Sequence, residues 1–298
     1  MTDYLRGYAT ASVPGIRLIC KHVLANGQAT TPDISDALRP TDIMPGAEGE
    51  GATLPASLEV AKDIELLTND GGRRNPVWSL GPRLEALKSP QTVLQTADMF
   101  RPLILKCVSQ TALKLATDEK RPSDVSLALT WVLGMDPLAR LSWDYSEMES
   151  TLKAEGMSDV IDNAEQWRSF RRWFTALGLG IAVRISRNKM MLSVSTASTI
   201  RDAGIGTQGL MSAREFINSL LEIVPIMGHR SLISQLPIKA RPAWEGTASP
   251  AVAQGLLELE AMKSLRMLPG EDSETAVRLA VGDESRAVRS IEWLSRGC

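Results

Sequence analysis

Residues 166–201 read QWRSFRRWFTALGLGIAVRISRNKMMLSVSTASTIR, and they decide the predicted fold. This stretch carries seven Arg or Lys residues and no Asp or Glu. The whole chain has 33 basic and 35 acidic residues and a net charge of −2, so positive charge is concentrated here. A near-neutral chain is unlike a general nucleic-acid coat protein, and any contact with nucleic acid must be local.

The first part of the stretch predicts an amphipathic helix. Apolar side chains recur at helical spacing and share one face: Trp167, Phe170, Phe174 and Leu177. Arginines occupy roughly the opposite face, and Gly178 and Gly180 then end the helix.

The second part predicts a β-hairpin, with strands at 181–185 and 190–194 around a turn at 186–189. A helix that leads directly into a basic-tipped hairpin is typical of the C-terminal half of a winged helix. In that fold the helix lies in the DNA major groove and the hairpin tip touches backbone or minor groove. We therefore expect double-stranded DNA to be contacted by Arg168, Arg171, Arg172, Arg184, Arg187 and Lys189.

An internal salt-bridged surface is the competing interpretation of the same charges. The segment just upstream supplies six acidic residues: Glu147, Glu149, Glu155, Asp159, Asp162 and Glu165. The hairpin tip favours DNA, because charges at a turn project outward, where the same domain does not easily neutralise them.

The pattern of helices followed by a hairpin occurs three times, which predicts a mainly α fold with short β-hairpins, built as three tandem winged-helix units. The expected domains are 1–90, 91–203 (linking helices plus the basic unit) and 204–298. The first unit should have helices at 13–27, 30–38 (capped by Thr31) and 53–67. Pro102 should interrupt or restart the linking helices.

The outer units differ from the middle one in charge. The first has an acidic third helix and only Arg73 and Arg74 at its hairpin tip as DNA-facing candidates. The third has a hairpin at 265–279 with an acidic tip at 271–274, followed by a closing helix that contains Val288 and Ile291. For the first unit, a structural or dimerising role is at least as well favoured as DNA contact. We expect the third unit to bind partners or to serve as scaffold.

The rest of the composition predicts a cytosolic protein without bound cofactor. No apolar run is long enough for a membrane span, and the N-terminus lacks a signal-peptide pattern. Three cysteines lie far apart, so neither disulfides nor a zinc site is expected, and Cys20 and Cys107 should be core residues. The oligomeric state is left open.

Catalytic motifs are missing from the sequence, so we expect no enzyme activity, no catalytic residues and no metal ligands. The two histidines, His22 and His229, are far apart and lie in no motif. Residues 204–209 match GxGxxG in letters, but no strand of the right kind precedes them, and a linker is expected. Trp173 should be a core residue, with base stacking as the alternative.

Residues 167–180 resemble the helix-to-strand segment of winged-helix accessory proteins in bacterial phage-defence clusters, and the family they resemble is DpdG-like. The clusters install 7-deazapurines in DNA and restrict DNA that lacks them. The resemblance implies a DNA-binding or scaffolding subunit that works with separate enzymes, and it carries over no catalytic residues. An interaction scaffold without DNA contact is the alternative function, and a transcription regulator with a ligand pocket is a weaker third.

Overall fold

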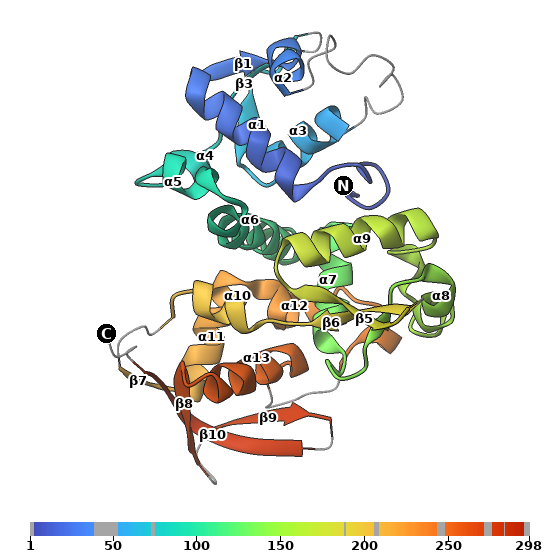
Figure 1. Ribbon diagram of the computed structural model, residues 1–298, viewed down its shortest axis with the longest axis vertical. Helices are drawn as coiled ribbons and strands as arrows, with labels where there is room; N and C mark the ends of the chain where they lie inside the picture. The colour runs from blue at the N-terminus through green and yellow to red at the C-terminus, as the bar shows by residue number, and fades with distance from the viewer. Residues whose placement is uncertain are drawn as a thin grey trace.

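The computed structural model describes residues 3–38, 53–72, 75–187, 189–205, 209–242, 248–270, 276–282 and 284–294. Within these ranges the chain is mainly helical with three small antiparallel sheets, which confirms the predicted fold class at that level. Figure 1 shows the sheets following one another along the long axis of the molecule, from the blue N-terminal part to the red C-terminal part. No helix in these ranges is long and apolar enough to cross a membrane.

The first part of the chain is a sheet of three short strands packed against three helices. Its elements are α1 (Val13–Asn26), β1 (Gln28–Thr30), α2 (Thr31–Leu38), α3 (Thr53–Asp63), β2 (Leu67–Asn69) and β3 (Val77–Leu80), with strand order β1-β3-β2. Helix α3 is shorter than predicted because Glu65 adopts a φ of 60°. The Leu66 amide then donates to Ala61 and the Glu65 amide to Lys62, which closes a Schellman motif.

The predicted cap of α2 is off by one residue. The Thr30 amide donates to the Asp33 carboxylate at 2.9 Å, and the Asp33 amide donates to the Thr30 hydroxyl at 3.3 Å. This reciprocal pair is a capping box around Thr30. The Thr31 hydroxyl instead accepts a hydrogen bond from Trp78 Nε1 at 2.9 Å.

Three helices then link the first sheet to the rest of the chain: α4 (Pro82–Glu85), α5 (Pro90–Gln95) and α6 (Ala97–Thr117). Pro102 was expected to interrupt or restart a helix, but it lies inside α6. Helix α6 packs on α1 on one side and on α7, α11 and α12 on the other, so it lies between the first sheet and the remaining two (Figure 1).

The middle part repeats the arrangement of the first. It consists of α7 (Asp124–Gly134), β4 (Leu141–Ser142), α8 (Tyr145–Ala154), a 3-10 turn (Met157–Asp159), α9 (Ala164–Ala176), β5 (Gly180–Ser186) and β6 (Lys189–Val194), with strand order β4-β6-β5. Helix α7 is buried from Asp124 to Leu133, because it packs against α6, α9 and α13 at once.

The last part contains α10 (Ala197–Asp202), β7 (Leu210–Ser212), α11 (Ala213–Ile223), α12 (Arg230–Ile233), α13 (Pro250–Ala261), β8 (Leu265–Pro269), β9 (Val277–Val281) and β10 (Glu284–Trp293). Short 3-10 turns lie at Pro225–Met227 and Ile238–Ala240. Strand β10 pairs with β7, β8 and β9.

The predicted closing helix is wrong, because Val288 and Ile291 belong to β10. Their spacing of three looks helical, but the register shifts between Val288 and Ser290. Such a bulge turns the strand so that both side chains are buried. The predicted hairpin at 265–279 is also wrong, since β8 and β9 each pair with β10.

Candidate nucleic-acid interface

Helix α9 is the predicted recognition helix, and its buried face forms as the sequence predicts. The Asn163 side chain caps its start by accepting from the Gln166 amide at 2.9 Å. The rings of Trp167, Phe170 and Phe174 stack in sequence, with centroids 5.2 and 5.5 Å apart. Trp173 is also buried, and its ring stacks on Tyr4 at 5.9 Å, which confirms the core assignment.

Two glycines set the direct passage from α9 into the hairpin. Gly178 has a φ of 73° and ends the helix in a Schellman motif, because the Leu179 amide donates to Phe174. Gly180 begins β5 against the same ring, and a Cβ atom there would lie 2.0 Å from a Phe174 ring carbon. The hairpin therefore starts within a few residues of the helix and stays on the same side of the molecule.

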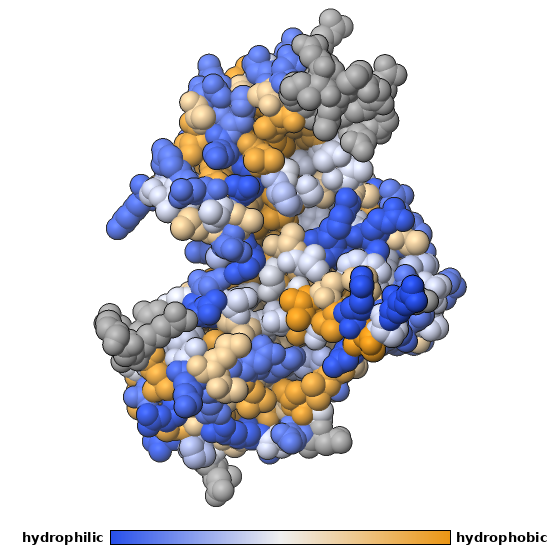
Figure 2. Space-filling view, viewed as in Figure 1, coloured by the Kyte–Doolittle hydropathy of each residue, from blue (hydrophilic) through white to orange (hydrophobic). Residues whose placement is uncertain are grey.

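Most of the basic residues of α9 and of the hairpin are exposed. Figure 2 shows hydrophilic side chains gathered over α9 and over the outer part of β5 and β6. Arg168 on the helix and Arg184 and Arg187 on the hairpin are exposed, and no ion pair joins them to an acid in the described part of the chain. Lys189 is also exposed and lies 3.7 Å from the Glu147 carboxylate.

The remaining two arginines of α9 already have protein partners. Arg171 is half-buried, donates from Nη1 to the Trp143 carbonyl at 2.7 Å, and has its Cζ 4.0 Å from the centroid of the Trp143 ring. Burial lowers the pKa of Arg171. Arg172 is exposed, but its Nη2 donates to the carbonyl of Ala9.

Residues 3–12 hold one side of α9, which the sequence did not predict. The carbonyl of Ala9 accepts from the Ser169 hydroxyl at 3.0 Å as well as from Arg172. The Leu5 amide donates to the two carboxylate oxygens of Asp124 at 3.0 and 2.9 Å. We call residues 3–12 the N-terminal clasp. Its hydrogen bonds join residues far apart in the sequence, so the sequence carries no local signal from which the clasp could be predicted.

The upstream acidic residues neutralise little of this surface. Glu149 pairs with Lys153 at 2.6 Å and Asp162 lies 3.8 Å from Arg6, while Glu147 pairs with Lys189. Among the ion pairs of the described residues, the last is the one that joins this acidic segment to the predicted DNA contacts.

Several predicted features lie outside the described residues, namely Arg73, Arg74, the acidic tip at 271–274 and Cys298. Cys20 and Cys107 are buried and unpaired, as expected, and burial raises the pKa of the Cys107 thiol to about 11. Within the described ranges, no group of three or more His, Cys, Asp or Glu could hold a metal ion.

The chain matches the family model described as DpdG-like over residues 7–273, which is most of its length. The chain belongs to the DpdG-like family. Comparisons of this DpdG-like chain with curated proteins and with solved structures gave no match. Family membership suggests a role in a DNA-modification and defence cluster with several components.

Proposed function

We propose that this DpdG-like chain is a non-catalytic, cytosolic DNA-binding subunit of a DNA-modification or restriction complex. Three tandem winged-helix units would form it, and the middle unit would contact double-stranded DNA through α9 and the β5–β6 hairpin. The observation that carries the proposal is that Arg168 of α9 and Arg184 and Arg187 of the hairpin that follows it are exposed without an acidic partner among the described residues.

The repeated topology supports the winged-helix part of the proposal. In each sheet the first strand (β1, β4 or β7) pairs with the last strand (β3, β6 or β10), and the last strand pairs with the strand that follows α3, α9 or α13 (β2, β5 or β8). The last sheet has an additional strand, β9, which also pairs with β10. The helices that precede β2, β5 and β8, namely α3, α9 and α13, all end in a Schellman motif, with Glu65, Gly178 and Lys263 at positive φ.

The charge pattern supports the DNA part. Each cation that displaces a counterion from a phosphate adds about −0.9 to the slope of log K against log[salt]. Five exposed cations lie on α9 and the hairpin, so we expect a slope of about −4.5 for duplex DNA when all five contact phosphate. They are Arg168, Arg172, Arg184, Arg187 and Lys189.

The test is fluorescence anisotropy on a labelled duplex, titrated with salt, for the whole chain and for Arg184→Glu plus Arg187→Glu. Both hairpin arginines are exposed and make no side-chain hydrogen bond or ion pair among the described residues, so the double variant should fold normally. The slope should become shallower by about 2 and affinity should fall at every salt concentration. The matched control is Arg214→Glu plus Lys239→Glu, which changes the net charge equally at exposed positions elsewhere.

The control variant should bind DNA with the original slope. An equal loss in both variants would show that binding follows net charge and not this face. Absence of binding by the unaltered chain at low salt would refute the proposal.

An interaction scaffold is the second candidate, and one feature of the hairpin favours it. Strand β5 is at the edge of its sheet, and Ile181 and Ile185 on it are 56% and 46% exposed. An open edge with apolar side chains can accept a strand from a partner. If the scaffold function holds, the variant Ile181→Lys plus Ile185→Lys should lose partner subunits in a pull-down, and the unaltered chain should not bind duplex DNA.

A further inference from the structure

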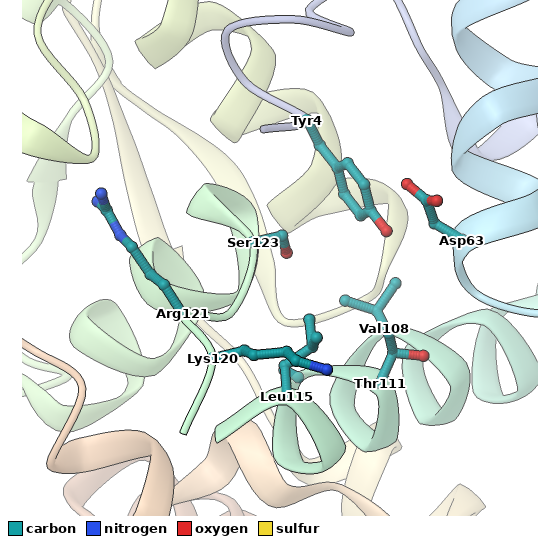
Figure 3. A pocket seen from close by; sticks show the side chains of 9 residues that line it. Tyr4, Asp63, Val108, Thr111, Leu115, Lys120, Arg121 and Ser123 are labelled. Atoms are coloured by element: carbon teal, nitrogen blue, oxygen red, sulfur yellow. The ribbon is translucent and has the colours of Figure 1, made fainter. Parts of the chain in front are cut away.

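A pocket of about 440 Å³ lies between the first part of the chain and the linking helix α6. Asp63 at the end of α3 and Tyr4 of the N-terminal clasp line one side (Figure 3). Val108, Ala112 and Leu115 of α6 form an apolar wall, and Lys120 follows that helix. The volume lies in the range of small-molecule sites, and the pocket is distinct from the basic face described above.

The Asp63 carboxylate has no neutralising partner. Its Oδ2 is buried without a hydrogen bond, and no ion pair to Asp63 occurs, among the residues that the structure describes. Figure 3 shows this carboxylate beside the Tyr4 hydroxyl. Burial, and next the charge of Asp63, raise the pKa of Tyr4, so the hydroxyl stays protonated. A buried acceptor without a donor is costly, so this side of the pocket favours a ligand with N–H groups.

The other polar side of the pocket favours an anion. The Lys120 side chain is 68% exposed, and its ammonium lies 3.8 Å from the Asp118 carboxylate, at the outer limit of an ion pair. Arg121 does not compete for the ligand, because its guanidinium points away from the pocket (Figure 3) and donates to the Asp159 carbonyl at 3.1 Å.

We propose that this pocket binds a purine nucleoside monophosphate, with base N–H groups on the Asp63 carboxylate and the phosphate on Lys120. A carboxylate accepts through two oxygens, which matches the adjacent N1–H and 2-amino donors of guanine better than the single N–H edge of hypoxanthine. The body of the ligand would lie on Val108, Ala112 and Leu115. Because Tyr4 also stacks on Trp173 of α9, a bound ligand would stabilise the N-terminal clasp.

The test is isothermal titration of the whole chain with GMP. Saturable binding is expected, and Asp63→Asn and Lys120→Ala should each weaken it about tenfold, the usual effect of losing one charged hydrogen bond. Matched controls are Glu222→Gln and Lys239→Ala, at exposed positions outside the pocket, which should bind GMP normally.

Other ligands are also titrated into the unaltered chain, so that the test does not depend on the folding of the variants. Guanosine lacks the phosphate and IMP lacks the 2-amino group, so both should bind more weakly than GMP. Arg184→Glu plus Arg187→Glu should leave GMP binding intact, which separates this pocket from the basic hairpin. The proposal is overturned by absence of GMP binding at millimolar concentration, by unchanged affinity in Asp63→Asn, or by loss of binding in the hairpin variant.

Discussion

Replacement of Asp124 by Asn tests how the N-terminal clasp is held to the rest of the chain. The Asp124 carboxylate is 2% exposed and accepts from the amides of Leu5, Arg6 and Val125, at 2.7 to 3.2 Å. Two effects act on it in opposite directions. Burial disfavours the charged form, whereas the three N–H donors favour it.

Burial dominates, and it raises the pKa of Asp124 from its ordinary value of 3.8 to about 6. Because the native state then holds the proton more tightly than the unfolded chain, the contribution of Asp124 to stability is greatest below pH 3.8 and is lost as the pH rises through about 6. From well below pH 3.8 to well above pH 6, the two pKa values correspond to a loss of about 3 kcal/mol of unfolding free energy. Asp124→Asn removes the titration and should remove this loss.

The assay is urea unfolding of both proteins at steps from pH 4 to pH 7.5, followed by tryptophan fluorescence, to which Trp173 under Tyr4 contributes. The unfolding free energy of Asp124→Asn minus that of the unaltered chain should rise by about 2.5 kcal/mol over this range. Asp136→Asn, at an exposed acid, is the matched control and should show no such rise. A difference that falls with pH would show that the N–H donors outweigh burial and would refute the reasoning.

Two further predictions concern the basic face. Gly180→Ala places a Cβ 2.0 Å from the Phe174 ring, so we expect destabilisation of about 1–3 kcal/mol by urea unfolding. Gly204→Ala has open space around it but a φ of 67°, so its cost of about 1–2 kcal/mol should come from backbone strain alone. Glu147→Gln removes the partner of Lys189 and should tighten DNA binding at low salt, with the gain vanishing at high salt. Unchanged affinity in Glu147→Gln at low salt would mean that Lys189 does not contact phosphate.

The middle helix and hairpin were predictable because their signals are local. The spacing of Trp167, Phe170 and Phe174 fixes the buried face of α9, and Gly178 and Gly180 mark its end. The N-caps Ser123, Ser212 and Ser249 have signals that are equally local, since a cap bonds to an amide two or three residues away.

The features that escaped prediction depend on contacts between distant residues. Strands β1 and β4 have three and two residues, too few for an alternating pattern, and they exist because β3 and β6 pair with them. Glu65 and Lys263 adopt positive φ although neither is Gly or Asn, so the ends of α3 and α13 carry no sequence mark. The bulge in β10 allows Val288 and Ile291, three residues apart, both to be buried, and in the sequence this spacing looks helical.

The same contacts change how the seven basic residues of the opening stretch should be weighed. Arg172 can bind a DNA phosphate only if its guanidinium breaks its hydrogen bond to the Ala9 carbonyl. Arg171 can do so only if it breaks its hydrogen bond to the Trp143 carbonyl. Each such exchange replaces one charge-assisted hydrogen bond by another, so its net contribution to DNA affinity should be small. Arg184 and Arg187 give up no protein partner among the described residues. In the proposed complex, the hairpin should therefore supply more of the binding free energy than the recognition helix.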